Sequence, residues 1–128
     1  MYRFKNFTKL HYFLIYVSGA ISTFSIPPFS FLPLIFCIGF GIYTINFTSN
    51  LLKTFIGAWF LGFGWFSFGL YWIGSAFIVA DKYHIFMMPI AIILLPSFLA
   101  LFWGCACVIA KLLTKDKTLS IINMIIFL

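Results

Sequence analysis

A run of 27 residues without a charged side chain, from Thr54 to Ala80, most constrains what this chain can fold into. As a single α-helix this run would be about 40 Å long, which exceeds the roughly 30 Å hydrocarbon core of a lipid bilayer. The rest of the chain has the same character: 64% of its 128 residues are hydrophobic and 8% are charged, against about 25% charged in typical soluble domains. A core of this size cannot hide so much apolar surface from water, so we predict an integral membrane protein.

The few charged residues divide the chain into several apolar runs. We predict four complete transmembrane helices and a partial fifth one, at about residues 10–26, 33–49, 54–80 and 86–110, with the partial helix at 118–128. The predicted fold is an all-α polytopic membrane protein that forms a single transmembrane domain over residues 1–128. A basic start followed by an apolar run also fits a cleavable signal peptide. Because a second apolar run follows almost at once, we favour a retained first helix.

Proline residues predict where the first helix ends and where the fourth helix begins and bends. Pro27 and Pro28 end the first run, since proline has no backbone N–H and restricts the residue before it. The proline-rich aromatic linker 27–33 then predicts a tight hairpin at the membrane interface. Pro89 is expected in the first turn of the fourth helix, and Pro96 is expected to kink that helix.

The basic residues predict the orientation of the helices. One side of the predicted topology holds seven of them and the other side holds only Lys82; the seven are Arg3, Lys5, Lys9, Lys53, Lys111, Lys115 and Lys117. Short loops rich in Lys and Arg stay in the cytoplasm. We therefore expect a multi-pass membrane protein with a cytoplasmic N-terminus and with the hairpins 27–33 and 81–84 outside.

The third predicted helix carries small residues on two faces. One face holds Ala58, Gly62, Gly69 and Ala76, and the roughly opposite face holds Gly57, Gly64, Ser67 and Ser75. Small residues allow helix backbones to approach closely in lipid. The pattern predicts a central helix packed on both sides.

Candidate chemical groups are few. Asp81 and His84 are three residues apart and could form a proton-handling pair, although two solvated loop residues are the simpler interpretation. Cys105 and Cys107 are two residues apart on a helix and so point to nearly opposite faces, while Cys37 stands alone in another run. We interpret all three cysteines as packing residues.

The remaining ionisable or polar candidates also lack a reactive arrangement. They are Lys53, Lys82, His11 and the pair Tyr71-Trp72, the last of which is typical of the aromatic belt at a membrane interface. No motif for a phosphate, a metal or a nucleophile is present. We predict no catalytic, cofactor-binding or metal-binding residue in this chain, no cofactor, and no nucleic-acid partner, because the net charge of +6 is explained as a topology signal.

Three segments, in order, resemble the apolipoprotein N-acyltransferase family. Residues 24–34, with Pro27-Pro28 and Pro33, resemble that family's first outer hairpin. Residues 62–73, which include Gly69-Leu70-Tyr71-Trp72-Ile73, are similar to the end of its third helix. Residues 95–104 are similar to its fourth helix. The resemblance covers almost the whole chain but only the opening quarter or so of a full-length member.

The resemblance implies a location in the bacterial inner (plasma) membrane and a function in lipoprotein maturation. Members transfer an acyl chain from a phospholipid to the N-terminal cysteine of a lipoprotein, using a Glu-Lys-Cys triad in a periplasmic nitrilase-like domain. This chain has no glutamate and lacks that domain, so we expect the N-terminal membrane part of such an enzyme, inactive by itself.

The expected partners are membrane lipids, with a phospholipid as the family's acyl donor, and a separately encoded catalytic part. A decayed gene product and one half of a split enzyme both remain open. The alternative is a small non-enzymatic membrane protein that packs against the helices of a larger complex.

Overall fold

The computed structural model describes residues 9–25, 30–48, 50–71, 88–113, 122 and 125–126. All regular secondary structure within these ranges is helical, as the sequence predicts. The helices are α1 (Lys9–Ser22), α2 (Phe36–Asn46), α3 (Leu51–Gly69) and α5 (Met88–Leu113), with 3-10 turns η1 (Thr23–Ser25) after α1 and η2 (Leu32–Ile35) before α2. Two of the helices are long and apolar enough to cross a membrane, Leu51–Gly69 with a mean hydropathy of 1.3 and Pro89–Leu113 with 2.4. A shorter apolar helix extends over Leu32–Asn46.

The end of the first helix is shaped by hydroxyl groups. Ser22 Oγ donates to the Ser18 carbonyl at 2.6 Å, and Ser25 Oγ donates to the Ser22 carbonyl at 2.7 Å. Such side-chain bonds compete with the helical ladder, and the chain tightens into η1 after Ser22. The expected span 10–26 is thus an α-helix only to Ser22.

The second expected span, 33–49, also divides into two parts. Pro33 lies in the 3-10 turn η2, where its missing N–H and fixed φ are tolerated. The α-helix proper starts at Phe36 and ends at Asn46. It is therefore shorter than the sequence predicts.

The third helix corrects the expected span 54–80 at both ends. It begins at Leu51 because the Asn50 side chain, expected in a loop, accepts a hydrogen bond from the Leu52 N–H at 2.9 Å and caps the helix. It ends at Gly69, a residue with poor helix propensity, and the Leu70 N–H bonds to the Phe66 carbonyl at 2.9 Å to close the last turn. Residues 72–80 lie outside the described residues.

The fourth expected span, 86–110, corresponds to α5, which extends to Leu113. Pro89 lies in its first turn and Pro96 lies inside it, as expected. Of the partial helix predicted at 118–128, the structure describes Ile122, Ile125 and Ile126, all three helical.

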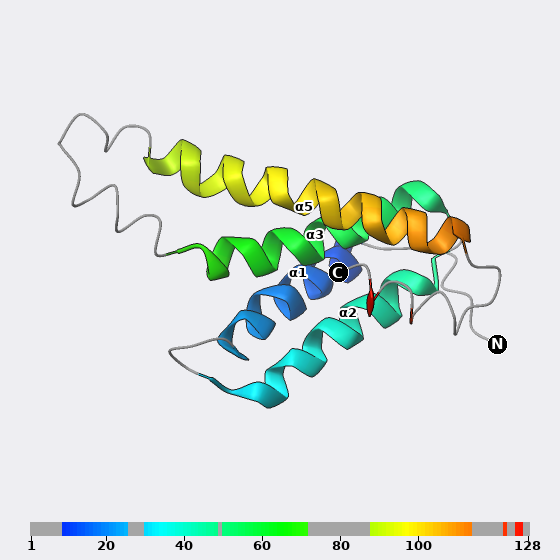
Figure 1. Ribbon diagram of the computed structural model, residues 1–128, viewed down its shortest axis with the longest axis horizontal. Helices are drawn as coiled ribbons and strands as arrows, with labels where there is room; N and C mark the ends of the chain where they lie inside the picture. Colours follow the sequence, from blue (N-terminus) through cyan, green and yellow to red (C-terminus); the bar gives the residue numbers. More distant parts are fainter. Residues whose placement is uncertain are drawn as a thin grey trace.

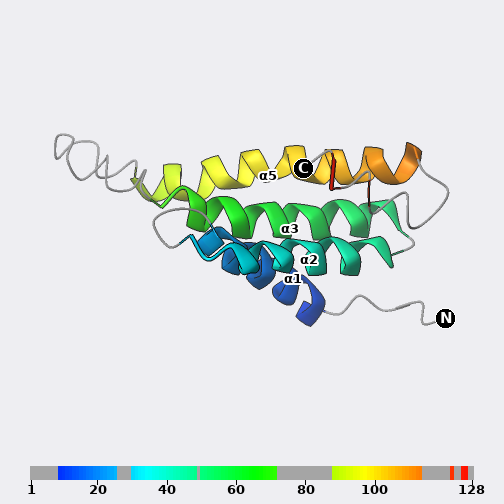
Figure 2. The ribbon, with the colours of Figure 1, turned by 60° about the horizontal axis from the view of Figure 1, so that its bottom comes forward.

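Helix α3 lies at the centre of the bundle, between α5 on one side and α1 and α2 on the other (Figures 1 and 2). Helices α1 and α3 run in the same direction. The rings of Tyr12 in the first turn of α1 and Phe60 midway along α3 are 5.7 Å apart, whereas Thr23, just after α1, donates through Oγ1 to the carbonyl of Trp65, further along α3, at 3.1 Å.

The two other helices run against α3. The last turn of α5 meets the first turn of α3, where Lys111 bonds to Thr54 at 2.8 Å, and Trp103 of α5 packs on Phe66 at 5.5 Å. For α2, Ile45 lies close to Gly57 whereas Gly41 lies close to Leu61. Successive described helices therefore alternate in direction.

The close helix contacts are made by glycines. A Cβ at Gly64 would overlap the carbonyl oxygen of Tyr16, and a Cβ at Gly19 would overlap that of Leu61, so α1 and α3 touch through their backbones. On the other face of α3, a Cβ at Gly62 would lie 3.1 Å from the Cβ of Trp103 in α5. At Gly64 and Gly62 the structure thus agrees with the prediction that α3 is packed on both sides by small residues. Gly69, predicted on the face of Gly62, lies instead near Thr23 on the side of α1, and Ala76 and Ser75 lie outside the described residues.

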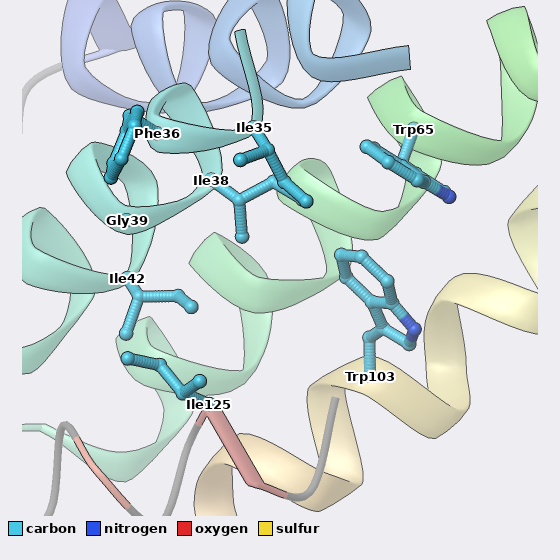
Figure 3. Close-up of a pocket in the computed structure, with 8 residues that line it drawn as sticks. All are labelled: Ile35, Phe36, Ile38, Gly39, Ile42, Trp65, Trp103 and Ile125. Atoms are coloured by element: carbon cyan, nitrogen blue, oxygen red, sulfur yellow. The ribbon is translucent and has the colours of Figure 1, made fainter. Parts of the chain in front are cut away.

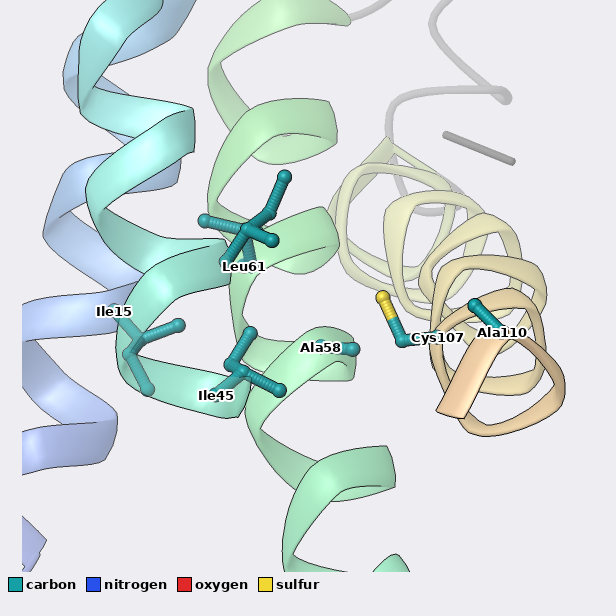
Figure 4. Close-up of a cluster of buried hydrophobic side chains, with 7 residues drawn as sticks. Ile15, Ile45, Ala58, Leu61, Cys107 and Ala110 are labelled. Atoms are coloured by element: carbon teal, nitrogen blue, oxygen red, sulfur yellow. The ribbon is translucent and has the colours of Figure 1, made fainter. Parts of the chain in front are cut away.

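The buried core is small and spans all four helices (Figure 4). It consists of Ile15, Ile42, Ile45, Ala58, Leu61, Cys107 and Ala110. Many large apolar side chains face outward instead, with exposed fractions of 80% for Phe36, 70% for Leu32 and 65% for Leu94. An outward surface this apolar matches hydrocarbon rather than water, in agreement with the two candidate spans.

Candidate functional site

Among the described residues, the candidate reactive side chains do not meet in one site. Cys105 is exposed and Cys107 is buried, as expected from their spacing. Cys37 is half-buried near the start of α2, and His11 lies near the start of α1. No group of three or more His, Cys, Asp or Glu capable of holding a metal occurs in the described part of the chain. The candidates Asp81, Lys82, His84 and Trp72 lie outside the described residues.

The basic residues that the structure describes gather at one end of the bundle. Lys9 begins α1 and Lys53 lies in the first turn of α3, which runs in the same direction. Lys111 lies in the last turn of the antiparallel α5. These three lysines thus lie at the same end, as predicted, whereas Arg3, Lys5, Lys82, Lys115 and Lys117 lie outside the described residues.

Lys111 connects two helices at this basic end. Its Nζ donates to Oγ1 of Thr54 and to the backbone carbonyl of Thr48, which precedes α3. Thr54 is fully buried, and its hydroxyl donates in turn to the Asn50 carbonyl at 3.1 Å. The partly buried ammonium thereby donates hydrogen bonds to neutral oxygen atoms at the end of an apolar helix, where a long lysine side chain can reach polar groups. Sequence reasoning treated Lys111 only as a topology signal.

A groove of about 440 Å³ lies over α3, between α2 and α5, and we call it the α2–α5 groove. It is lined by Ile35, Phe36, Ile38, Gly39, Ile42, Trp65, Trp103 and Ile125. Figure 3 shows the two tryptophans at one end and Ile42 next to Ile125 at the other. Because none of these side chains titrates, the groove can bind an apolar partner but cannot transfer protons or attack a carbonyl group.

The two tryptophans at one end of the groove pack against each other and against neighbouring residues of α3. The ring centroids of Trp65 and Trp103 are 6.3 Å apart with an interplanar angle of 30°. Trp103 also packs on Gly62, which leaves room for its ring, and edge-on against Phe66. Trp65 lies in segment 62–73 and Trp103 lies in segment 95–104, but the sequence alone did not show that the two side chains are in contact.

A second groove, of about 410 Å³, lies on α1 and α3. Its lining is mostly aromatic: Tyr12, Phe13, Tyr16, Phe60 and Phe63, with Lys9 at its rim. The rings of Tyr16 and Phe63 are 5.9 Å apart, so side chains of the two helices meet in its wall.

Comparison with known proteins gives the family of the chain. The sequence model of the apolipoprotein N-acyltransferase N-terminal domain matches residues 18–128. The chain belongs to this family. An apolipoprotein N-acyltransferase of Brucella melitensis is 38% identical over 112 residues, and one of Rhizobium rhizogenes is 34% identical over 114 residues. One of Rhodopseudomonas palustris is 31% identical over 118 residues.

These alignments cover the two proteins unequally. They include 79%, 80% and 88% of this chain, respectively, but only 21%, 21% and 22% of the relatives. The chain thus spans about a fifth of the length of the curated relatives that it matches. No solved structure matches it. The match confirms the family that was predicted from residues 24–34, 62–73 and 95–104.

Proposed function

We propose that this chain forms the membrane-embedded N-terminal part of an apolipoprotein N-acyltransferase of the bacterial inner membrane. In this role it crosses the membrane four times and starts a fifth crossing, with the basic end in the cytoplasm. The reaction moves an acyl chain from a phospholipid to the α-amino group of a lipoprotein's N-terminal cysteine. The chain supplies the membrane scaffold for this reaction and is inactive by itself.

The match of residues 18–128 to the family's N-terminal domain carries the proposal. The alternating helix directions support four crossings, since they place Lys53 and Lys111 at the same end of the bundle. The burial of Cys107 and the composition of the chain support the proposed inactivity. A thioester route needs an activated thiolate with a base nearby, whereas Cys107 is buried in the core and the sequence has no glutamate.

The alternative function, a non-enzymatic protein that packs on helices of another complex, loses its original support. It rested on the two small-residue faces of α3, which suggested neighbours from outside the chain. Over the described part of α3 the chain's own helices cover both faces, since Gly64 faces α1 and Gly62 faces α5.

A chimera tests the proposed function. This chain replaces the matched N-terminal segment of the Brucella melitensis relative, and the purified protein is incubated in phospholipid vesicles with a diacylated lipopeptide. We expect triacylated product from the chimera and none from this chain alone. A chimera that is folded by circular dichroism but no more active than the relative without that segment would refute the role as a scaffold. Triacylated product from the isolated chain, lost in Cys37→Ser, would refute its inactivity.

A further inference from the structure

The α2–α5 groove is a surface that the chain's own described helices leave open. On the opposite side, α1 covers α3 so closely that Gly19 and Gly64 leave no room for a methyl group. At Gly39, in contrast, an added Cβ would meet nothing within 4 Å, and Phe36 beside it is 80% exposed. One face of α2 therefore has space for another backbone to approach.

We propose that the α2–α5 groove is the docking site for a further apolar membrane helix from the remaining four-fifths of the family polypeptide. This inference rests on the proposed function and names the surface through which the scaffold holds the rest of the enzyme. The partner is a transmembrane helix that places large aliphatic side chains against Trp65 and Trp103 and passes close to Gly39.

The wall of the groove at the Ile42 end is the first argument. Ile125, which lies 83 residues after Ile42 in the chain, lines the groove next to it (Figure 3). A helical residue from the last part of the chain thus lies beside α2 at this surface, and it is still 56% exposed. The apolar surface between α2 and α5 is therefore open to a further segment.

The chemistry of the groove is the second argument. Its lining has no charged residue, so a charged or polar partner would leave its groups unsatisfied in an apolar environment. The paired tryptophans offer large, rigid contact surfaces, which are typical of the residues that dominate binding interfaces. Gly39 supplies the small residue that close helix packing in lipid requires.

The relatives supply the third argument. Because the chain covers about a fifth of their length, a full family polypeptide has further segments that are available to pack against this domain. The second groove is less suited to receive a helix, since Lys9 lies at its rim and aromatic rings already crowd its wall.

Photocrosslinking of two co-expressed polypeptides tests the inference. The full chain carries p-benzoylphenylalanine at position 39, in the groove, or at position 13, which is exposed on α1. The tagged remainder of the Brucella melitensis relative is the second polypeptide. We expect an adduct with this remainder from position 39 and little from position 13. Adducts from position 39 only with a second copy of the chain, or only with lipid, would overturn the inference, as would an adduct mainly from position 13.

A matched pair of substitutions provides the second measurement. Gly39→Trp fills the groove, and the open space around Gly39 predicts that the chain still folds. Phe40→Trp changes the neighbouring exposed position and serves as the control. We expect at least about a tenfold loss of the co-purified remainder with Gly39→Trp and no loss with Phe40→Trp. Equal co-purification by both variants would refute the docking site. If both variants co-purify equally but the chimera is active, the docking site is refuted and the proposed function is still supported.

Discussion

Lys111 Nζ in the last turn of α5 lies 2.8 Å from Thr54 Oγ1 in the first turn of α3, and it donates a hydrogen bond to that hydroxyl. The same ammonium donates a hydrogen bond to the carbonyl of Thr48, so the Lys111 side chain links α5 to the α2–α3 connection. Thr48 contrasts with Thr54, because its own hydroxyl is buried without a hydrogen-bond partner among the described residues.

We expect Thr54→Val to destabilise the protein and Thr48→Val to leave its stability equal or higher. The first change deletes an acceptor of Lys111 and should lower the free energy of unfolding by about 1 kcal/mol. The second keeps the acceptor carbonyl and removes an unsatisfied buried hydroxyl. Thermal unfolding in detergent, followed by circular dichroism, measures both. Equal destabilisation by the two variants would show that the Lys111–Thr54 bond has no specific effect.

Gly64→Ala and Gly39→Ala should have opposite effects on stability. Alanine favours a helix over glycine by about 1 kcal/mol, and at Gly39 nothing opposes this gain. At Gly64 the new methyl group would overlap the Tyr16 carbonyl and force α1 from α3, a loss of about 1–3 kcal/mol. The same unfolding experiment decides the signs, and a stabilising Gly64→Ala would contradict the backbone contact.

Single-cysteine variants should distinguish the two faces of α5. With only Cys105 present, the exposed thiol should react with N-ethylmaleimide at least about tenfold faster than Cys107 does in the matched variant, since a buried thiol is inert. The ratio of rates is the readout, because both thiols lie in the same apolar helix. After denaturation the two rates should become equal, which controls for reagent access.

Cysteine labelling should show the orientation in the membrane. In a background without native cysteines, Ser30→Cys should react with a membrane-impermeant maleimide added outside intact cells stripped of their outer membrane. Asn50→Cys, also exposed, should react only after the membrane is opened. The basic end at Lys53 and Lys111 is the physical reason, since such residues remain cytoplasmic. The reverse pattern would invert the proposed topology.

The sequence by itself determined the helical class, the approximate helix positions and the role of α3. Long uncharged runs such as 54–80 have no stable alternative to helices in lipid, because every backbone group must be satisfied within the segment. The two glycine faces of α3 likewise predicted its central place. Helix ends were less accurate, since the cap at Asn50 and the stop at Gly69 depend on single side-chain and backbone bonds.

Only the tertiary structure decided which helix covers which face of α3, and where a surface stays open. Small residues specify that a neighbour comes close but not which neighbour, so Gly64 with α1 and Gly62 with α5 could not be told apart beforehand. The hydrogen bond from Lys111 to Thr54 joins residues 57 positions apart. The α2–α5 groove similarly combines Trp65 and Trp103 with side chains of α2. Such contacts depend on the relative positions of the helices, which packing sets and no local pattern encodes.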